Sequence, residues 1–164
     1  MAYGLKIQEV PEQDPRLSRF GGISKLDKIV LQADRDWRPF RPTLEIQNAF
    51  GFDRMACVTY SAFNVIETLA FRKFGIRLNL ADRFTAKMSG TTIEGNNFSD
   101  VAESIRKLHG AVEEDKWPDD ARSFEEYYKE VADEVVRLGK LFLNDWVIEY
   151  EAVWDTEDQL FESL

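Results

Sequence analysis

The sequence contains one cysteine, Cys57, at the first turn of a segment whose apolar residues have helical spacing. At the start of a helix, the unpaired backbone N–H groups and the positive end of the helix dipole favour a thiolate over a thiol. Such sites lower a thiol pKa from about 8.5 into a range of roughly 3.5 to 7.5. Nucleophilic chemistry at sulfur is therefore one interpretation of Cys57. The other is a structural cysteine that packs as a small hydrophobic side chain, which placement alone favours.

Metal and disulfide chemistry are not expected in this chain. A single cysteine cannot form an internal disulfide, and with His109 as the single histidine there is no Cys/His cluster with zinc-ligand spacing. We therefore expect no metal and no cofactor.

The segment that begins at Cys57 has the clearest pattern in the sequence. Small and apolar residues recur with helical spacing, and Gly75 closes the segment. The residues of this stripe are Val58, Ser61, Ala62, Val65, Ile66, Leu69, Ala70 and Phe74. We expect a central buried helix that starts at the cysteine.

Three further segments have helical patterns. The first covers 80–89 and ends at Ser89-Gly90, and the second begins at a Ser99 cap and stops at Gly110. The third is an amphipathic helix over 123–138 with Gly139 behind it.

Strand-like patterns are short. Residues 28–32 (KIVLQ) form one, and residues 146–154 alternate well enough to form another. Helices followed by a strand predict an α+β protein with one domain. Its expected parts are an extended N-terminal arm over 1–44, a helical part over 45–120, and a helix and strand over 121–164.

The residues after the cysteine resemble the nucleophile helix of papain-like cysteine peptidases. In that family an aromatic residue follows the cysteine at the third position, Ser-Ala comes next, and a glutamate stands at the tenth. Tyr60, Ser61, Ala62 and Glu67 fall in that register.

Other segments resemble the same family in the same order. Asp36-Trp37-Arg38 is similar to the opening of many mature papain-like domains, and Leu80-Ala81-Asp82 to the Leu-Ser-Glu of the family's second helix. Residues 110–118 resemble its Gly-Gly-Val-x-x-Glu to Tyr-Pro stretch. The resemblance implies the α+β papain-like fold, with a mainly helical left half and an incomplete β right half.

The resemblance also implies catalytic roles. Cys57 would be the nucleophile of peptide-bond hydrolysis, and the Gln47 side chain would join the Cys57 N–H in the oxyanion hole. Gln47 lies ten residues before the cysteine rather than the family's usual six. An ordinary loop glutamine is nearly as good an interpretation.

Gly95, Asn96 and Asn97 stand where the family has its glycine-rich substrate loop. The resemblance implies that they bind an extended peptide or protein substrate through backbone hydrogen bonds. A plain turn is at least as good an interpretation.

The sequence departs from the family pattern in its catalytic base. The mechanism needs an imidazole, and the family supplies it from its second half. His109 instead falls at the end of the third predicted helix, where a partly cationic imidazole would cap helix carbonyls. The chain is therefore expected to be a fragment, inactive alone, whose histidine comes from a missing C-terminal half or from a second chain.

Charge and hydropathy limit the partners. Residues 113–164 carry 17 acidic and 5 basic side chains, which would repel a phosphate backbone, so no nucleic-acid partner is expected. A solvated acidic face is the favoured interpretation over a docking surface for a basic partner. No long apolar run and no signal peptide are visible, so we expect no membrane partner and, by default, a cytoplasmic protein.

Two other functions remain open from the sequence. One is a non-catalytic binding or structural module that keeps a cleft and helix without the catalytic pair. The other is an unrelated α+β interaction domain in which the match at Cys57 is accidental.

Overall fold

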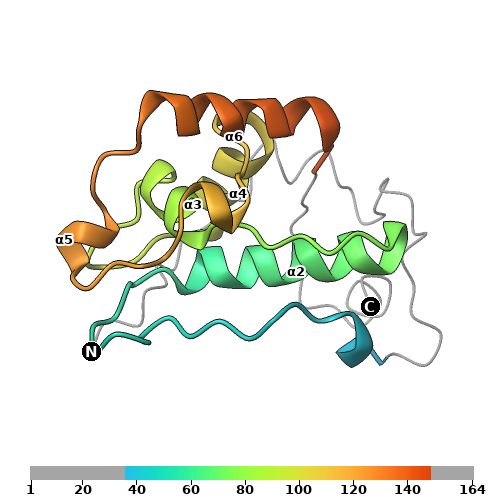
Figure 1. Ribbon diagram of the computed structural model, residues 1–164, viewed down its shortest axis with the longest axis horizontal. Helices are drawn as coiled ribbons and strands as arrows, with labels where there is room; N and C mark the ends of the chain where they lie inside the picture. Colours follow the sequence, from blue (N-terminus) through green and yellow to red (C-terminus); the bar gives the residue numbers. More distant parts are fainter. Residues whose placement is uncertain (1–35, 149–164) are drawn as a thin grey trace, which may run out of the picture.

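The computed structural model describes residues 36–148, which fold into packed helices joined by loops (Figure 1). Helical residues make up 52% of them and strand residues only 4%, without a sheet. The predicted α+β class with a papain-like β half is therefore wrong over the described residues. The physical reason lies after residue 121, where the chain continues as helix instead of turning into a sheet.

The longest helix, α2 (Cys57–Phe74), begins and ends where the apolar spacing predicts. Gly75 adopts the left-handed conformation at φ 71° and donates its N–H to the Phe71 carbonyl, which terminates the helix. In Figure 1, α2 runs through the middle of the molecule, between the segment 36–56 on one side and α3 (Asp82–Met88) and α4 (Phe98–Glu103) on the other. The element that carries the cysteine is thus the one on which both of these helices pack.

Two short helices follow α2. The first, α3 (Asp82–Met88), confirms the predicted second helix. The second, α4 (Phe98–Glu103), is capped by Asn97 rather than by the predicted Ser99, because the Asn97 side chain accepts the Asp100 N–H. The chain then widens into a π-turn, η2 (Ser104–Leu108), before the predicted stop at Gly110.

The predicted helix over 123–138 is wrong. The structure has a single turn, α5 (Phe124–Tyr127), then a non-helical stretch, and then α6 (Asp133–Asp145). Gly139, predicted to stop the helix, lies inside α6 because the helix needs a residue without a side chain there. A Cβ at Gly139 would lie 2.6 Å from the His109 carbonyl oxygen.

The two isolated bridges do not build a sheet. Leu80 pairs with Glu113, flanked by bonds from the Ala81 N–H to the Val112 carbonyl and from the Glu114 N–H to the Asn79 carbonyl. The chain after this bridge makes one 3₁₀ turn, η3 (Glu114–Lys116). The second bridge, Thr92 with Gly95, closes a tight turn before α4.

The ends of the predicted layout are only partly described. Of the predicted arm over 1–44, residues 36–44 are described and include a 3₁₀ turn, η1 (Arg38–Phe40), while the predicted strand at 28–32 lies outside. Trp146 to Ile148 are not in a strand, and the rest of the predicted strand at 146–154 also lies outside the described residues. The three-part division of the chain remains a prediction.

The apolar core lies where α2 meets α3, α4 and the bridge. Its largest cluster consists of Val58, Phe63, Leu80, Val101, Ile105 and Ala111. A second cluster joins α3 to α6 through Phe84 and Leu138. Within residues 36–148, no helix has both the length and the apolar character needed to cross a lipid bilayer.

Candidate functional site

Cys57 is the first residue of α2, with Ala56 as the N-cap, and its partly buried side chain packs against the largest core cluster. Burial raises the pKa of its thiol, and the charge of Asp53 adds to that effect. Hydrogen bonds from the backbone N–H groups of Val58 and Cys57 to the sulfur lower the pKa, but by less than burial raises it. The expectation of a lowered thiol pKa is therefore wrong, and at neutral pH Cys57 is a thiol in this chain.

The turn before Cys57 is held by Asp53. Its Oδ1 accepts the Met55 N–H at 2.8 Å and the Gln47 side-chain amide at 2.6 Å. Met55 adopts the left-handed conformation at φ 56°, which is unfavourable for a residue with a long side chain. The structure thus bonds the Gln47 amide to Asp53, whose charge also acts on the Cys57 thiol.

The predicted substrate residues Gly95, Asn96 and Asn97 lie in the tight turn that leads into α4. Gly95 exchanges both of its backbone hydrogen bonds with Thr92. The buried Asn96 amide donates to the Ser89 carbonyl at 3.0 Å. Asn97 caps α4. These bonds tie the turn to the end of α3 and to the start of α4, and the role in substrate binding remains a prediction.

His109 lies at the end of η2, as the sequence predicts, but its imidazole is not a cationic cap. Nδ1 lies 3.1 Å from the Ser104 hydroxyl. Burial lowers the pKa of the ring, and the positive charge of Lys140 lowers it further. The imidazole is therefore neutral near pH 7, and its hydrogen-bonding partner is Ser104.

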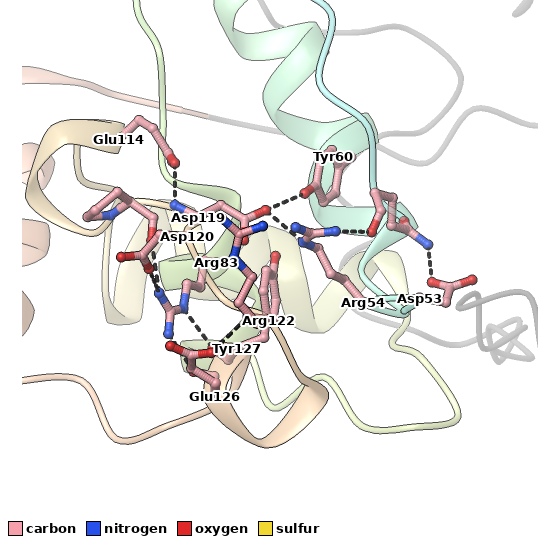
Figure 2. Close-up of polar contacts among 12 residues, drawn as sticks. Asp53, Arg54, Tyr60, Arg83, Glu114, Asp119, Asp120, Arg122, Glu126 and Tyr127 are labelled. Atoms are coloured by element: carbon pink, nitrogen blue, oxygen red, sulfur yellow. Dashed lines mark hydrogen bonds and ion pairs between the residues drawn. The ribbon is translucent and has the colours of Figure 1, made fainter. Parts of the chain in front are cut away.

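A buried arginine near the cysteine was not among the predicted site residues. Arg54 is 0% exposed, and its Nε lies 2.6 Å from Oδ2 of Asp119 (Figure 2). Its Nη1 donates to the Gln47 carbonyl at 2.5 Å, and the same Asp119 oxygen accepts the Tyr60 hydroxyl at 3.4 Å. Nothing in the sequence near Arg54 signals that Asp119 will pair with it.

A second buried arginine, Arg83 of α3, holds the segment 117–128, which we call the strap. Its guanidinium donates to the carbonyls of Pro118, Tyr127 and Glu126 and to the Asp120 carboxylate (Figure 2). The strap therefore has two arginine anchors, Arg54 beside the cysteine and Arg83 in α3.

Three further carboxyl groups are buried or partly buried around the bridge. Burial raises the pKa of Glu67 to about 7 and that of Glu114 to about 7. Burial and a hydrogen bond with Glu45 raise the pKa of Asp82. Glu67 Oε1 accepts the Leu80 N–H at 2.7 Å, so the side chain that the family resemblance singled out joins α2 to the bridge.

These carboxylates do not form a metal site. Among the described residues, no three His, Cys, Asp or Glu side chains converge in a way that could hold a metal ion.

Comparisons with protein-family models, with curated proteins and with solved structures found no match to this chain. A function must therefore be inferred from the residues and their geometry.

Proposed function

We propose that this chain carries the nucleophile of a thiol peptidase, with Cys57 attacking the carbonyl carbon of an extended peptide substrate. The supporting observation is the position of the sulfur. It is partly exposed at the first residue of the longest helix, and hydrogen bonds from the backbone N–H groups of Cys57 and Val58 favour its thiolate form. N–H groups at a helix start can also donate to the oxyanion that forms beside the sulfur.

In the proposed reaction, a base takes the thiol proton while sulfur bonds to the carbonyl carbon. The C–N bond then breaks, the leaving amine takes the proton, and water hydrolyses the thioester. The raised thiol pKa makes the base essential. This base is an imidazole of a second chain in the proposed reaction, since the His109 imidazole is engaged with Ser104. The chain alone should not hydrolyse peptides.

Peptide-directed alkylation tests this proposal without the missing base. Cys57 is treated with an epoxysuccinyl peptide and, separately, with epoxysuccinate that carries no peptide, and labelling is followed by intact mass. Binding of the peptide beside the sulfur should raise the second-order rate constant by about tenfold or more, because the reaction becomes effectively intramolecular.

A thiol elsewhere on the same helix provides the control. Ser61 is exposed one turn further along α2, so Ser61→Cys in a Cys57→Ala background offers a thiol away from the candidate site. This variant should react with both epoxides at similar rates. Equal rates for the two epoxides at Cys57 itself would contradict the proposal.

A second candidate function is a non-catalytic peptide-binding module. The observation that favours it is that the predicted site residues are already hydrogen-bonded within the chain. The Gln47 amide is bonded to Asp53, the Asn96 side chain to Ser89, and the Asn97 side chain to Asp100. For this function, the Cys57→Ser variant should still bind peptide. The epoxysuccinyl peptide should also label Cys57 no faster than epoxysuccinate without a peptide.

A further inference from the structure

Arg54 is buried three residues before Cys57, and its charge needs compensation there. A guanidinium stays protonated at any physiological pH, so burying it is unfavourable unless partners replace water. Asp119 supplies the opposite charge and the Gln47 carbonyl accepts one N–H. The rings of Phe52 and Tyr127 lie 4.9 and 5.4 Å from the guanidinium carbon.

These contacts join three parts of the chain at one side chain. Gln47 belongs to the segment before the turn, Arg54 to the turn itself, and Asp119 to the strap. The backbone of Arg54 is held as well, because the Tyr128 hydroxyl donates to its carbonyl at 2.5 Å. Residue 54 is therefore fixed through both its side chain and its main chain.

The residue fixed in this way directly precedes the left-handed Met55. A left-handed residue other than glycine is unfavourable and persists only where its surroundings hold it. The direction of the chain at Met55 sets where α2 begins. It thus sets where the Cys57 thiol and the first N–H groups of α2 point.

We propose that Arg54 is a positioning residue for the reaction of Cys57, and that the strap controls the geometry of the nucleophile through the Arg54–Asp119 ion pair. This inference rests on the proposed function, in which Cys57 is the nucleophile. In this inference, the Asp119 carboxylate and the Gln47 carbonyl both hold the Arg54 guanidinium in place.

Arg83 provides a matched control, because it is also buried, at 2% exposure, and binds the same strap. Its hydrogen-bond partners are Pro118, Asp120, Glu126 and Tyr127, all in the strap, and none belongs to the turn at 53–57. Arg83→Lys leaves the contacts of Arg54 with Asp119 and with the Gln47 carbonyl in place, so it should lower stability without redirecting the cysteine.

The experiment compares Arg54→Lys with Arg83→Lys in the full chain. Lysine keeps the charge but cannot bind Asp119 and the Gln47 carbonyl together, since its ammonium lacks the planar fork of a guanidinium. Both variants should lower the urea midpoint of unfolding. Only Arg54→Lys should also reduce the peptide-directed acceleration of Cys57 labelling, by about tenfold, because small displacements of reacting groups have effects of that size.

The pH profile of iodoacetamide labelling separates this inference from the proposed function. Arg54→Lys should move the midpoint of the profile to higher pH, because the N–H groups of Val58 and Cys57 no longer face the sulfur as well, while Arg83→Lys should leave it in place. A wild-type chain without peptide acceleration would refute the peptidase function, yet the pH profile would still test the positioning role.

Two results would overturn the inference. One is an unchanged profile and an unchanged peptide acceleration in Arg54→Lys, and the other is the same change in both lysine variants. If Arg54→Lys does not fold, Asp119→Asn is the second variant. It weakens the ion pair in a partly exposed partner and should shift the profile in the same direction by a smaller amount.

Discussion

At Cys57, two sets of interactions act on the thiol in opposite directions. The N–H groups at the start of α2 favour the thiolate, while burial and the nearby Asp53 charge favour the thiol and outweigh them. The motif around Cys57 predicts the first effect, because it depends only on position within a helix. Burial and the side-chain arrangement at Asp53 depend on the folded turn and could not be read from spacing.

The Asp53 charge can be removed with little change of shape. Asp53→Asn keeps the Oδ1 acceptor for the Met55 N–H, so the turn should persist. We expect the pKa of the Cys57 thiol to fall, since one of the two causes that raise it is removed. The pH midpoint of iodoacetamide labelling measures this directly.

Glu130→Gln is the control for Asp53→Asn. Glu130 is highly exposed, pairs with Lys87, and is not among the groups that act on the thiol. Its loss removes one negative charge from the chain and should leave the labelling midpoint in place. A midpoint that stays constant in Asp53→Asn would contradict the role given to that carboxylate.

Arg54 and Arg83 illustrate what a residue-level reading of sequence cannot provide. Arginine is mostly exposed in proteins, so a sequence predicts surface positions for both. Their burial depends on the strap, whose carbonyls and carboxylates meet them only in the folded chain. The polar contacts of Arg54 and Arg83 were for this reason missing from the predicted site.

Among the elements, predictions succeeded where apolar spacing and a stop signal agree. The segment after Cys57 ends at Gly75, an open position where a left-handed residue can close a helix. The prediction over 123–138 failed because the apolar period continues across 128–132, which the structure leaves non-helical. Periodicity does not reveal that Gly139 is needed for close packing rather than as a stop.

Gly139→Ala should destabilise the chain by roughly 3 kcal/mol, within the range for overpacked core positions. A Cβ there would lie 2.6 Å from both the His109 carbonyl oxygen and the Phe84 ring, and neither is the end of a flexible side chain. Urea unfolding followed by circular dichroism measures the loss.

Gly75→Ala is the comparison for Gly139→Ala. Gly75 has no neighbour within 4 Å of a built Cβ, so only its left-handed conformation opposes the substitution. The expected loss is about 1 kcal/mol. Equal losses of unfolding free energy in the two variants would contradict the prediction that crowding against His109 and Phe84 makes Gly139→Ala the more destabilising change.

For the whole molecule, the buried carboxyl groups set the pH dependence of stability. Glu67 and Glu114 have pKa values of about 7 in the folded chain, against 4.5 for the ordinary side chain, and the pKa of Asp82 is also raised. At pH values between about 4.5 and 7, the folded state therefore binds more protons than the unfolded state. The contribution of these groups to stability is therefore fully present below about pH 4.5 and is lost as pH rises through 7.

Thermal unfolding between pH 5 and pH 8 should show this decrease. Each pKa unit corresponds to about 1.4 kcal/mol, so the shift of Glu67 alone removes roughly 3 kcal/mol over this range. His109 acts in the opposite sense, because its pKa is lowered, but it is one group against three. A midpoint that rises steadily from pH 5 to pH 8 would contradict the assignment.

Glu67→Gln isolates the contribution of the buried carboxyl group in α2. Glutamine keeps the oxygen that accepts the Leu80 N–H but does not ionise. The variant should match the wild type near pH 4.5 and exceed its stability at pH 8, by up to roughly 3 kcal/mol. Destabilisation at pH 8 would mean that the Glu67 charge is favourable where it lies.

The π-turn at η2 has a consequence for insertions and deletions in this chain. The Ser104 carbonyl accepts the N–H groups of both His109 and Gly110, which encloses one more residue than a regular helical turn would. Deleting a residue between them would let α4 continue as an unbroken helix and would rotate Gly110 away from Gly139, where the backbones touch. The contact between Gly110 and α6 therefore depends on the number of residues in this turn rather than on their types.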